Sequence, residues 1–402
     1  MRILVVNCGS SSLKFRIIAM PDEKELVSGE AQQVGPKTSR PSRVVIRENG
    51  KEEIAEVPMP TLTAAFSETM RLLEGRSHLR PQAIAHRIVH GADEFHSHVM
   101  LDAGVLAKLR AIQGMAPLHN PPATDVAEAC MKKFPKLPNA IIIDMAFHAT
   151  IPEYAATYAL PRDLCKELGI RKYGFHGISH QYSSEEAARL LQKPAGRLNA
   201  VCCHLGSGGA SLCAIEKGRS IDNTMGYSPL QGLVMSTRSG DLDPALTLRL
   251  LAEANGDAAR VSGVLNKKSG VLGMSGFSAD IRDVLSRTAD TKEVFGPHEI
   301  SSQLYLWRIR KYLGAYLTVV REPDAIIFTD TIGEQVPQVR HAVCAGMDAF
   351  GVEIDAKKNS RIAEFPADVA TDKSAVRIFV IQANEELAMA RFAWRMLSPG
   401  NN

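Results

Sequence analysis

Two strand–turn–strand elements, one in each half of the chain, constrain the fold more than any other feature of the sequence. Residues 3–18 begin with an apolar, β-branched run, pass through a small-residue turn at 7–12 and return as a second apolar run. Residues 200–212 repeat this order around a glycine-rich turn at 206–209. Glycine and serine also form ordinary turns, so one such element would indicate little. Two at corresponding places predict a duplicated architecture, with phosphates clamped between the halves.

Strand-like and helix-like segments alternate along the whole chain, which is typical of an α/β protein. The run 325–329 is apolar throughout, as expected for a strand covered on both faces, and we predict a turn directly after it at 330–334. A helix is predicted at 244–251, where Asp243 provides the N-cap and a proline follows it. The last helix is predicted to open at Glu385, with acidic residues in its first turn.

The proline-bearing stretch 150–153 is the predicted hinge between two domains. The amino-terminal domain would cover residues 1–149 and be completed by a carboxy-terminal helix within 382–402. The second domain would cover residues 150–381. A chain of 402 residues with 45% hydrophobic content can bury two cores of that size.

Charge and cysteine content exclude several classes of protein. The 47 basic and 44 acidic residues leave a formal charge of +3, too close to balance for binding nucleic acid or a membrane surface. The 7 cysteines are odd in number and scattered through apolar runs, which predicts reduced core residues. The chain enters its first strand without a signal peptide and has no apolar run of about 18 residues. We therefore expect a cytoplasmic protein.

Arginines are the first candidates for chemistry, because phosphoryl transfer needs positioning and charge neutralisation more than covalent help. Arg87 ends a short apolar run, and Arg238 lies in a polar loop before the helix at 244–251. The planar guanidinium suits two-point recognition of a carboxylate or a phosphate. Taken alone, each could also be a surface residue or an ion-pair partner. Their small-residue loops favour a functional role.

Histidines and carboxylates complete the candidates. His119 lies between two prolines and His176 in a glycine-flanked loop, where a histidine can donate to a phosphoryl group or be a satisfied structural residue. Asp144 follows an apolar strand and Glu385 opens the last helix. Such oxygen ligands hold Mg²⁺ together with phosphates and water, although Asp144 could also cap a turn and Glu385 complement the helix dipole. The sequence lacks the P-loop and dinucleotide-binding patterns, so a nucleotide would need another architecture.

The order of the motifs resembles the acetokinase family, within the superfamily that also contains sugar kinases, Hsp70 and actin. The motifs are Asn-x-Gly-Ser-Ser-Ser-x-Lys at 7–14, His-Arg-x-Val-His-Gly at 86–91, Pro-Leu-His-Asn-Pro at 117–121, Asp-x-Ala-Phe-His at 144–148, Tyr-Gly-Phe-His-Gly-x-Ser-His at 173–180, Thr-Arg-x-Gly-Asp-x-Asp-Pro at 237–244 and Asn-Glu-Glu-Leu at 384–387. The resemblance implies an α/β fold of two ribonuclease H-like domains that close over an active-site cleft, in a homodimer. It also implies a Mg²⁺- or Mn²⁺-dependent acetate kinase that moves a phosphoryl group directly, in line, between ATP and acetate, giving acetyl phosphate and ADP. Propionate is a further candidate substrate.

The resemblance also assigns roles to the matching positions. The catalytic residues that it implies are Arg87, Arg238, His176 and Asp144. The metal-binding residues are Asn7 and Glu385. The acyl group would rest in a small apolar pocket, suited to a methyl or ethyl tail, made by Val89, Leu118, Phe175 and Pro229. The residues that would bind phosphates and the nucleotide are Lys14, His119, His204, Gly206, Ser207, Gly208, Asp280, Ile281, Arg282, Thr331, Gly333 and Glu334.

Two loops depart from the family's usual sequence. Ser207 stands where the second phosphate loop usually has asparagine, and residues 330–335 read Asp-Thr-Ile-Gly-Glu-Gln where the adenosine loop usually reads Gly-Ile-Gly-Glu-Asn after a small residue. Thr331 places a β-branched side chain where glycine would permit close approach of a nucleotide or a positive φ. The same chemistry with pyrophosphate or another nucleotide as donor is therefore the alternative. A chaperone-like ATPase of the superfamily is disfavoured, since it need not keep both arginines, His176 and the acyl pocket together.

Overall fold

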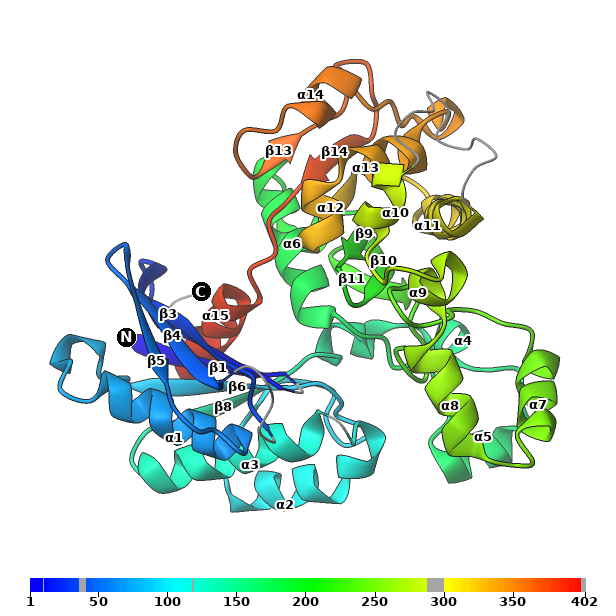
Figure 1. Ribbon diagram of the computed structural model, residues 1–402. Helices are drawn as coiled ribbons and strands as arrows, with labels where there is room; N and C mark the ends of the chain where they lie inside the picture. Colours follow the sequence, from blue (N-terminus) through cyan, green and yellow to red (C-terminus); the bar gives the residue numbers. More distant parts are fainter. Residues whose placement is uncertain (10, 36–40, 118, 288–299, 399–402) are drawn as a thin grey trace. The chain divides into compact units, whose positions relative to one another are not determined.

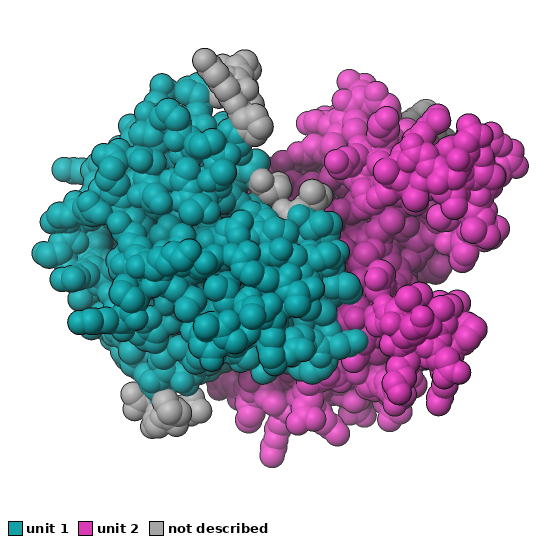
Figure 2. Space-filling view, turned by 90° about the horizontal axis from the view of Figure 1, so that it is seen from below, with its two compact units in different colours: residues 1–146, 384–402 teal, residues 147–383 magenta. Residues whose placement is uncertain are grey.

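The computed structural model describes residues 1–402 except 10, 36–40, 118, 288–299 and 399–402. The chain divides into two compact units, which Figure 2 shows in different colours. Unit 1 comprises Met1–Ala146 with Asn384–Asn402, and unit 2 comprises Phe147–Ala383. The limits of domains expected from the sequence, at 149/150 and 381/382, stay a prediction.

Unit 1 is built, within its described residues, on an eight-stranded sheet with the order β5-β4-β3-β2-β1-β6-β8-β7 (Figure 1). The strands are β1 Arg2–Cys8, β2 Leu13–Ala19, β3 Lys24–Gln32, β4 Arg43–Glu48, β5 Lys51–Glu56, β6 Ala83–Ile88, β7 Val99–Met100 and β8 Asn139–Ile143. β1 and β2 pair antiparallel, which confirms the hairpin predicted at 3–18. β1, β6 and β8 run parallel, so their carboxyl ends meet at one edge of the sheet.

Helices cover both faces of this sheet. They are α1 Leu62–Leu73, α2 Ala103–Ala111, α3 Asn120–Lys133 and α15 Glu385–Leu397, with 3₁₀ turns at Ser77–Leu79 and Gln113–Met115. α1 and α3 pack together on one face, and α15 packs against β1, β6 and β8 on the other (Figure 1). α15 begins at Glu385 as predicted, because the Asn384 side chain caps it by accepting from the Leu387 amide at 3.2 Å.

The described part of unit 2 contains a six-stranded sheet with the order β11-β10-β9-β12-β14-β13. The strands are β9 Ala200–Leu205, β10 Ala210–Glu216, β11 Arg219–Asn223, β12 Ala325–Thr329, β13 Ala367–Asp368 and β14 Arg377–Val380. β9 pairs antiparallel with β10 and parallel with β12, which itself runs parallel to β14. The order β11-β10-β9-β12-β14 therefore repeats β3-β2-β1-β6-β8 in strand direction, which confirms the predicted duplicated α/β architecture.

Helices also cover both faces of the second sheet. They are α4 Glu153–Ala156, α5 Arg162–Leu168, α6 Gly177–Leu190, α7 Pro244–Glu253, α8 Ala258–Lys267, α9 Gly270–Ser275, α10 Ile281–Arg287, α11 Ile300–Val320, α12 Asp330–Gln335, α13 Pro337–Cys344 and α14 Ala356–Ser360. The remaining 3₁₀ turns are Ala146–Thr150, Ala195–Arg197 and Asp348–Phe350. Cys202 interacts with Ser183 of α6 and Cys203 with Cys344 of α13, so α6 and α13 lie on opposite faces.

Every cysteine is free, as the sequence predicted, and most are buried. Among the described helices, none has the length and apolar character that crossing a membrane requires. The helix predicted at 244–251 is confirmed as α7, and the Asp243 side chain caps it by accepting from the Ala245 amide at 2.9 Å.

The turn predicted at 330–334 is wrong, because the chain passes directly from β12 into α12. The start of a helix leaves backbone N–H groups without partners inside the helix. Here Glu334 Oε1 accepts from the Asp330 amide at 2.8 Å and from the Ala383 amide at 2.7 Å. This side chain therefore stabilises a helix start that sequence patterns for a turn do not reveal.

Candidate functional site

The first group of predicted residues lies at the carboxyl ends of the parallel strands of unit 1. Asn7 is on β1, Arg87 is on β6, Asp144 follows β8 and Glu385 opens α15. Arg87 Nη2 donates to Asp144 Oδ2 at 2.8 Å, and Arg87 Nη1 lies 3.3 Å from Glu385 Oε2. The same Nη1 donates to Asn7 Oδ1 at 3.4 Å. We call these residues, together with Glu386, the arginine–carboxylate cluster.

Carboxylates outnumber guanidinium groups in and around this cluster. Burial alone would lower the pKa of Arg87, but Asp144 and then Glu385 raise it above its ordinary value. Glu386 Oε2 lies 3.6 Å from Arg16 Nη2. Arg16 Nη1 also lies 3.2 Å from Glu25 Oε2, so carboxylates outnumber guanidinium groups here. The charge of Arg87 is thus largely committed to its protein neighbours.

The arginine–carboxylate cluster fits a hard cation such as Mg²⁺. An Asn7 oxygen and a Glu385 carboxylate oxygen both lie within 3.4 Å of Arg87 Nη1, so two oxygen ligands lie beside the same guanidinium nitrogen. Within the described residues, no group of three or more His, Cys, Asp or Glu side chains is placed to hold a metal ion by itself. Mg²⁺ is usually held by one or two carboxylates with substrate phosphates and water. A sparse oxygen set of this kind therefore suits Mg²⁺.

Other predicted residues of unit 1 lie near the same edge of the sheet. Lys14 is exposed on β2 and pairs with Asn7 in the β1–β2 register. Val89 follows β6 and is partly exposed, and His119 directly precedes α3. Leu118 lies outside the described residues. Lys14 is thus placed beside the cluster, while the roles of Val89 and His119 stay predictions.

His148, His176, His180 and His204 form a histidine cluster in unit 2. The rings of His176 and His204 are stacked with centroids 4.2 Å apart. The His180 centroid lies 6.0 Å from that of His204 and 5.8 Å from that of His148. His176 and His204 were predicted as site residues, whereas His148 and His180 were not. The spacing of four between His176 and His180, which places both on one face of a helix, is the signal that could have found His180.

Buried serine hydroxyls hold the two predicted histidines in place. His176 Nδ1 lies 2.9 Å from Ser211 Oγ, and His204 Nδ1 lies 2.9 Å from Ser179 Oγ. Both serines are fully buried, Ser179 in the first turn of α6 and Ser211 on β10. Sequence reasoning missed them because a serine in a strand or helix carries no functional pattern of its own.

Arg238 lies beside the histidine cluster, in the loop before α7. A Cβ atom added to Gly209 would lie 3.4 Å from Arg238 Nη1 and 3.5 Å from His176 Nε2, so both side chains reach the β9–β10 turn. Burial lowers the pKa of Arg238, and among the described residues no carboxylate pairs with it. A largely buried guanidinium without a counter-charge is costly unless an anion binds it. Arg238 is therefore placed to receive an anionic ligand.

The turn between β9 and β10 has the glycine that its close packing requires. A Cβ atom on Gly206 would lie only 2.4 Å from Asp330 Oδ2 and 2.8 Å from the Gly209 carbonyl oxygen. Ser207 and Gly208 follow it and are exposed. The backbone of this turn is thus open to a ligand, as the predicted phosphate-binding role needs.

Asp330 places a carboxylate against this turn. Its Oδ2 lies 3.0 Å from His204 Nε2, and its Oδ1 accepts from the Thr331 amide at 2.6 Å. Burial would raise the pKa of Asp330, but His204 and Thr331 together hold it well below its usual range. The left-handed backbone, with φ of 65°, also lies at Asp330 rather than at Thr331, where the sequence placed it. A carboxylate with a lowered pKa therefore contacts the turn.

Three of the residues predicted to bind phosphates and the nucleotide, Gly206, Ser207 and Ile281, line a small pocket in unit 2. The residues that line it are Gly206, Ser207, Ala210, Met235, Ser236, Val271, Ala279, Ile281, Tyr305 and Ile332. Arg282 Nη2 pairs with Asp280 Oδ2 at 2.6 Å, and Arg282 Nη1 donates to Gln335 Oε1 at 3.4 Å. These bonds connect the start of α10 to the end of α12, which contains the buried Gly333 and Glu334. The structure thus gathers segments that the sequence separates widely.

The remaining members of the predicted acyl pocket belong to unit 2. Phe175 is buried, and its carbonyl oxygen lies 2.9 Å from His148 Nε2. Pro229 is partly exposed in the loop after β11. Their contact with an acyl group stays a prediction.

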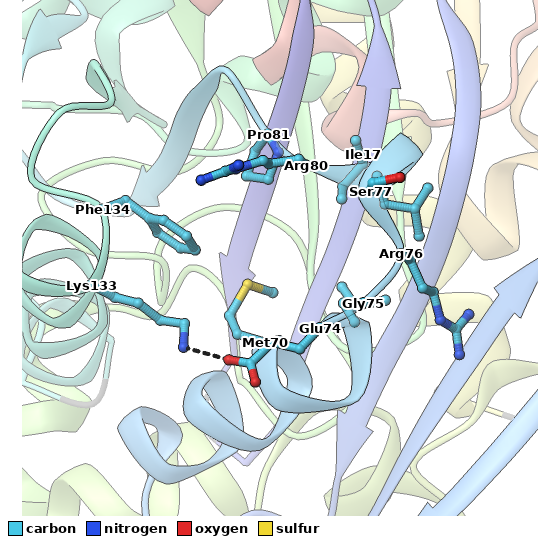
Figure 3. Close-up of a pocket in the computed structure, with 12 residues that line it drawn as sticks. Ile17, Met70, Glu74, Gly75, Arg76, Ser77, Arg80, Pro81, Lys133 and Phe134 are labelled. Atoms are coloured by element: carbon cyan, nitrogen blue, oxygen red, sulfur yellow. Dashed lines mark hydrogen bonds and ion pairs between the residues drawn. The ribbon is translucent and has the colours of Figure 1, made fainter.

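A pocket of about 500 Å³ in unit 1 lies apart from these residues (Figure 3). It is lined by Ile17, Met70, Leu73, Glu74, Gly75, Arg76, Ser77, Leu79, Arg80, Pro81, Lys133 and Phe134. Its lining residues 74–81 come just before β6 in the chain, whereas Arg87 is near the carboxyl end of that strand. Figure 3 shows Lys133 extending to Glu74, and Arg76 pairs at 2.5 Å with Glu48. Most of its charges are therefore already paired, and we assign it no role in the site.

Comparison with known proteins gives matches over almost the whole chain. Residues 2–391 match the model of the Acetokinase family. The acetate kinase of Dictyoglomus thermophilum is 39% identical and covers 99% of both chains, and that of Clostridium kluyveri is 40% identical over 97% of this chain and 96% of its own. The solved acetate kinase of Porphyromonas gingivalis superposes with a TM-score of 0.90 at 33% identity, covering 98% of this chain and 99% of its own. A propionate kinase from Francisella tularensis gives 0.87 at 35%, covering 97% and 98%.

Proposed function

Because the chain belongs to the acetokinase family, we propose that it transfers a phosphoryl group between ATP and acetate, giving acetyl phosphate and ADP. The reaction is a phosphotransfer with a carboxyl group as acceptor. The observation that supports it best is Arg238, which reaches the glycine turn beside His176 and has no carboxylate partner among the described residues. An anionic substrate supplies the counter-charge that this side chain lacks.

The two arginines have different parts in the proposed reaction. Arg238 binds the transferring phosphoryl group and neutralises charge that develops on it during direct in-line attack by a carboxylate oxygen. Arg87 is held by Asp144 and Glu385, so its guanidinium is oriented before substrate arrives. A group that is oriented in advance costs no reorganisation at the moment of reaction. Arg87 therefore acts mainly by positioning the acceptor carboxylate.

His176 is the proposed hydrogen-bond donor to the transferring group. Its Nε2 lies at the same glycine turn as Arg238 Nη1, and its ring is held by Ser211 and by stacking on His204. His204, with the exposed turn that follows it, is proposed to face the donor phosphates. His119 is proposed as a supporting contact.

Asn7 and Glu385 are the residues that would hold Mg²⁺, or Mn²⁺ in its place. When bound, the ion offsets negative charge on the donor phosphates. Asp144 keeps Arg87 paired, so that the guanidinium does not displace the cation from the nearby oxygen ligands. Lys14, opposite Asn7 in the β1–β2 pair, adds a positive charge for phosphate at the same edge.

The acyl and nucleotide contacts complete the proposal. Val89, Leu118, Phe175 and Pro229 are proposed to bind the methyl group, and one extra methylene changes binding by only about 1–3 kcal/mol, so propionate is a further substrate. The segments with Asp280 to Arg282 and Thr331 to Glu334 are proposed to bind the nucleotide. The alternative donor, pyrophosphate, is not favoured by the similarities above. We further propose that the enzyme acts as a homodimer in the cytoplasm.

A hydroxamate assay tests the proposed function directly. The purified protein, with Mg²⁺, is given acetate, propionate or butyrate and each of ATP, GTP and pyrophosphate. We expect acetyl hydroxamate with ATP and acetate, less product with propionate, and dependence on the added metal ion. Absence of product from every carboxylate with ATP would refute the proposal, and product from pyrophosphate alone would reverse the choice of donor.

A further inference from the structure

Hydrogen-bond partners reveal where the proton lies on two members of the histidine cluster. His148 Nε2 lies 2.9 Å from the Phe175 carbonyl oxygen, and His204 Nε2 lies 3.0 Å from the Asp330 carboxylate. Both oxygens can only accept, so each Nε2 carries a proton, and Asn223 Nδ2, which lies 3.2 Å from His148 Nε2, donates to the same Phe175 carbonyl oxygen. In both residues Nδ1 faces a serine hydroxyl, at 2.8 Å for Ser220 and 2.9 Å for the partner of His204. His148 and His204 thus share one arrangement, with a proton on Nε2 and a serine hydroxyl at Nδ1.

His176 Nδ1 also faces a serine hydroxyl, but this serine has a second hydrogen-bond partner. Ser211 Oγ lies 2.9 Å from His176 Nδ1 and also 2.8 Å from His180 Nε2. A hydroxyl group carries one hydrogen, and among the described residues these two ring nitrogens are the only hydrogen-bond partners of Ser211 Oγ, so that hydrogen is used only when Ser211 donates to one ring and accepts from the other. A proton on His180 Nε2 therefore favours donation by Ser211 to His176 Nδ1.

His180 is fully buried, and burial lowers its pKa well below the ordinary value, so its ring carries a single proton. Its Nδ1 is buried and has no hydrogen-bond partner among the described residues. A proton on Nδ1 would therefore be a buried N–H group without an acceptor, which folded proteins rarely tolerate. A proton on Nε2 instead finds the Ser211 oxygen as its acceptor.

We propose that His180 and Ser211 are positioning residues that fix the tautomer of His176. His180 Nε2–H donates to Ser211 Oγ, and the Ser211 hydroxyl donates to His176 Nδ1. The single proton of His176 then lies on Nε2, the atom that reaches the glycine turn beside Arg238. Resting on the proposed function, this N–H group is the donor to the transferring phosphoryl group.

The same chain of bonds opposes a second proton on His176. An imidazolium would carry a proton on Nδ1, so Ser211 Oγ would either accept from both rings, which leaves its own buried hydrogen without an acceptor among the described residues, or turn its hydroxyl to His180 Nε2. That turn would drive the proton of His180 onto Nδ1, where no described residue accepts it. Arg238, His180 and His204 are among the groups that face His176, and the guanidinium of Arg238 also disfavours a second positive charge. His176 is thus kept as a neutral donor.

Nitrogen-15 spectroscopy of histidine rings tests the tautomer without relying on activity. The full-length protein is labelled at its ring nitrogens, and His176→Gln identifies the signals of that ring. Ser211→Ala removes the hydroxyl, and Ser211→Thr keeps it as the matched control. His180→Leu removes the ring donor, and His180→Gln keeps an N–H group near the position of Nε2. Thermal unfolding shows that each variant is folded.

In the wild type we expect a protonated Nε2 and a hydrogen-bonded, unprotonated Nδ1 on His176. Ser211→Ala is expected to mix the two tautomers and to lower kcat about tenfold with little change in KM, as for loss of one hydrogen bond of ordinary strength. Ser211→Thr should show the wild-type spectrum and kcat. His180→Gln should lie closer to the wild type than His180→Leu in both the spectrum and kcat.

A proton on His176 Nδ1 in the wild type would overturn the assignment. An unchanged spectrum and full kcat in folded Ser211→Ala would overturn the role of Ser211. A wild-type protein that shows the expected spectrum but makes no acyl phosphate would refute the proposed function and leave the tautomer assignment intact.

Discussion

Replacing each of the two arginines with alanine should separate folding from catalysis. Arg87→Ala removes the guanidinium that pairs with the Asp144 carboxylate, whose side chain is only 2% exposed. Removing one member of a buried ion pair destabilises a protein by about 3–5 kcal/mol. Arg238→Ala leaves no carboxylate unpaired among the described residues and removes a largely buried charge. We expect its free energy of unfolding to stay within about 1 kcal/mol of wild type, while kcat falls about 100-fold or more.

Urea unfolding and the hydroxamate assay measure the two effects on the same preparations. Arg249→Ala is the control, because this arginine is 79% exposed on α7 and its contact with Glu253 is 4.0 Å long, so neither quantity should change. The double variant Arg87→Ala with Asp144→Asn should regain stability but not activity, since the buried charge is gone. The reasoning is refuted if Arg238→Ala loses as much stability as Arg87→Ala, or keeps normal turnover.

Three further changes test the nucleotide side of unit 2. Gly206→Ala places a methyl group 2.4 Å from the Asp330 carboxylate. We therefore expect the KM for ATP in initial-rate measurements to rise about tenfold. An unchanged KM would contradict the close packing. Tyr305→Phe removes a buried hydroxyl without a hydrogen-bond partner among the described residues. Urea unfolding of the ligand-free protein should therefore show a free energy of unfolding about 1 kcal/mol higher. A clear decrease in this free energy would mean that the hydroxyl is hydrogen-bonded. The pKa of Asp330 is lowered on folding, so its contribution exists above the unfolded value of about 4 and is lost as the pH falls through the folded value. The difference in melting temperature between wild type and Asp330→Asn should therefore shrink below about pH 4, and a difference that is constant from about pH 3 to about pH 7 would contradict this.

Sequence patterns predict many strands and helices of the fold correctly, because each of these elements depends on residues within it or next to it. The apolar runs that become β1, β2, β9 and β10 are buried on sheets, and the cap residues Asp243 and Asn384 mark helix starts that the structure confirms. The start of α12 could not be predicted in the same way. It depends on Glu334, whose carboxylate bonds both to its own helix and to the Ala383 amide 49 residues away.

The residues of the candidate site also differ in whether the sequence can predict them. Motifs identify side chains that reach outward to a ligand, such as His176 and Arg238. They do not identify the groups behind them, because Ser211 lies 35 residues from His176 and meets it only when β10 packs against α6. Asp330 is a further example, since its effect on Gly206 and His204 requires the end of β12 to lie beside β9.

The structure also distinguishes the two arginines, which the sequence alone does not. From the sequence they are equivalent, each a guanidinium in a small-residue loop. In the structure Arg87 is held by Asp144 and Glu385, whereas Arg238 has no such carboxylate among the described residues. The loss of activity in an Arg87 variant would therefore combine a folding defect with a catalytic one. An Arg238 variant isolates the charge that meets the substrate, so its kcat is the cleaner measure of how much that charge contributes to phosphoryl transfer.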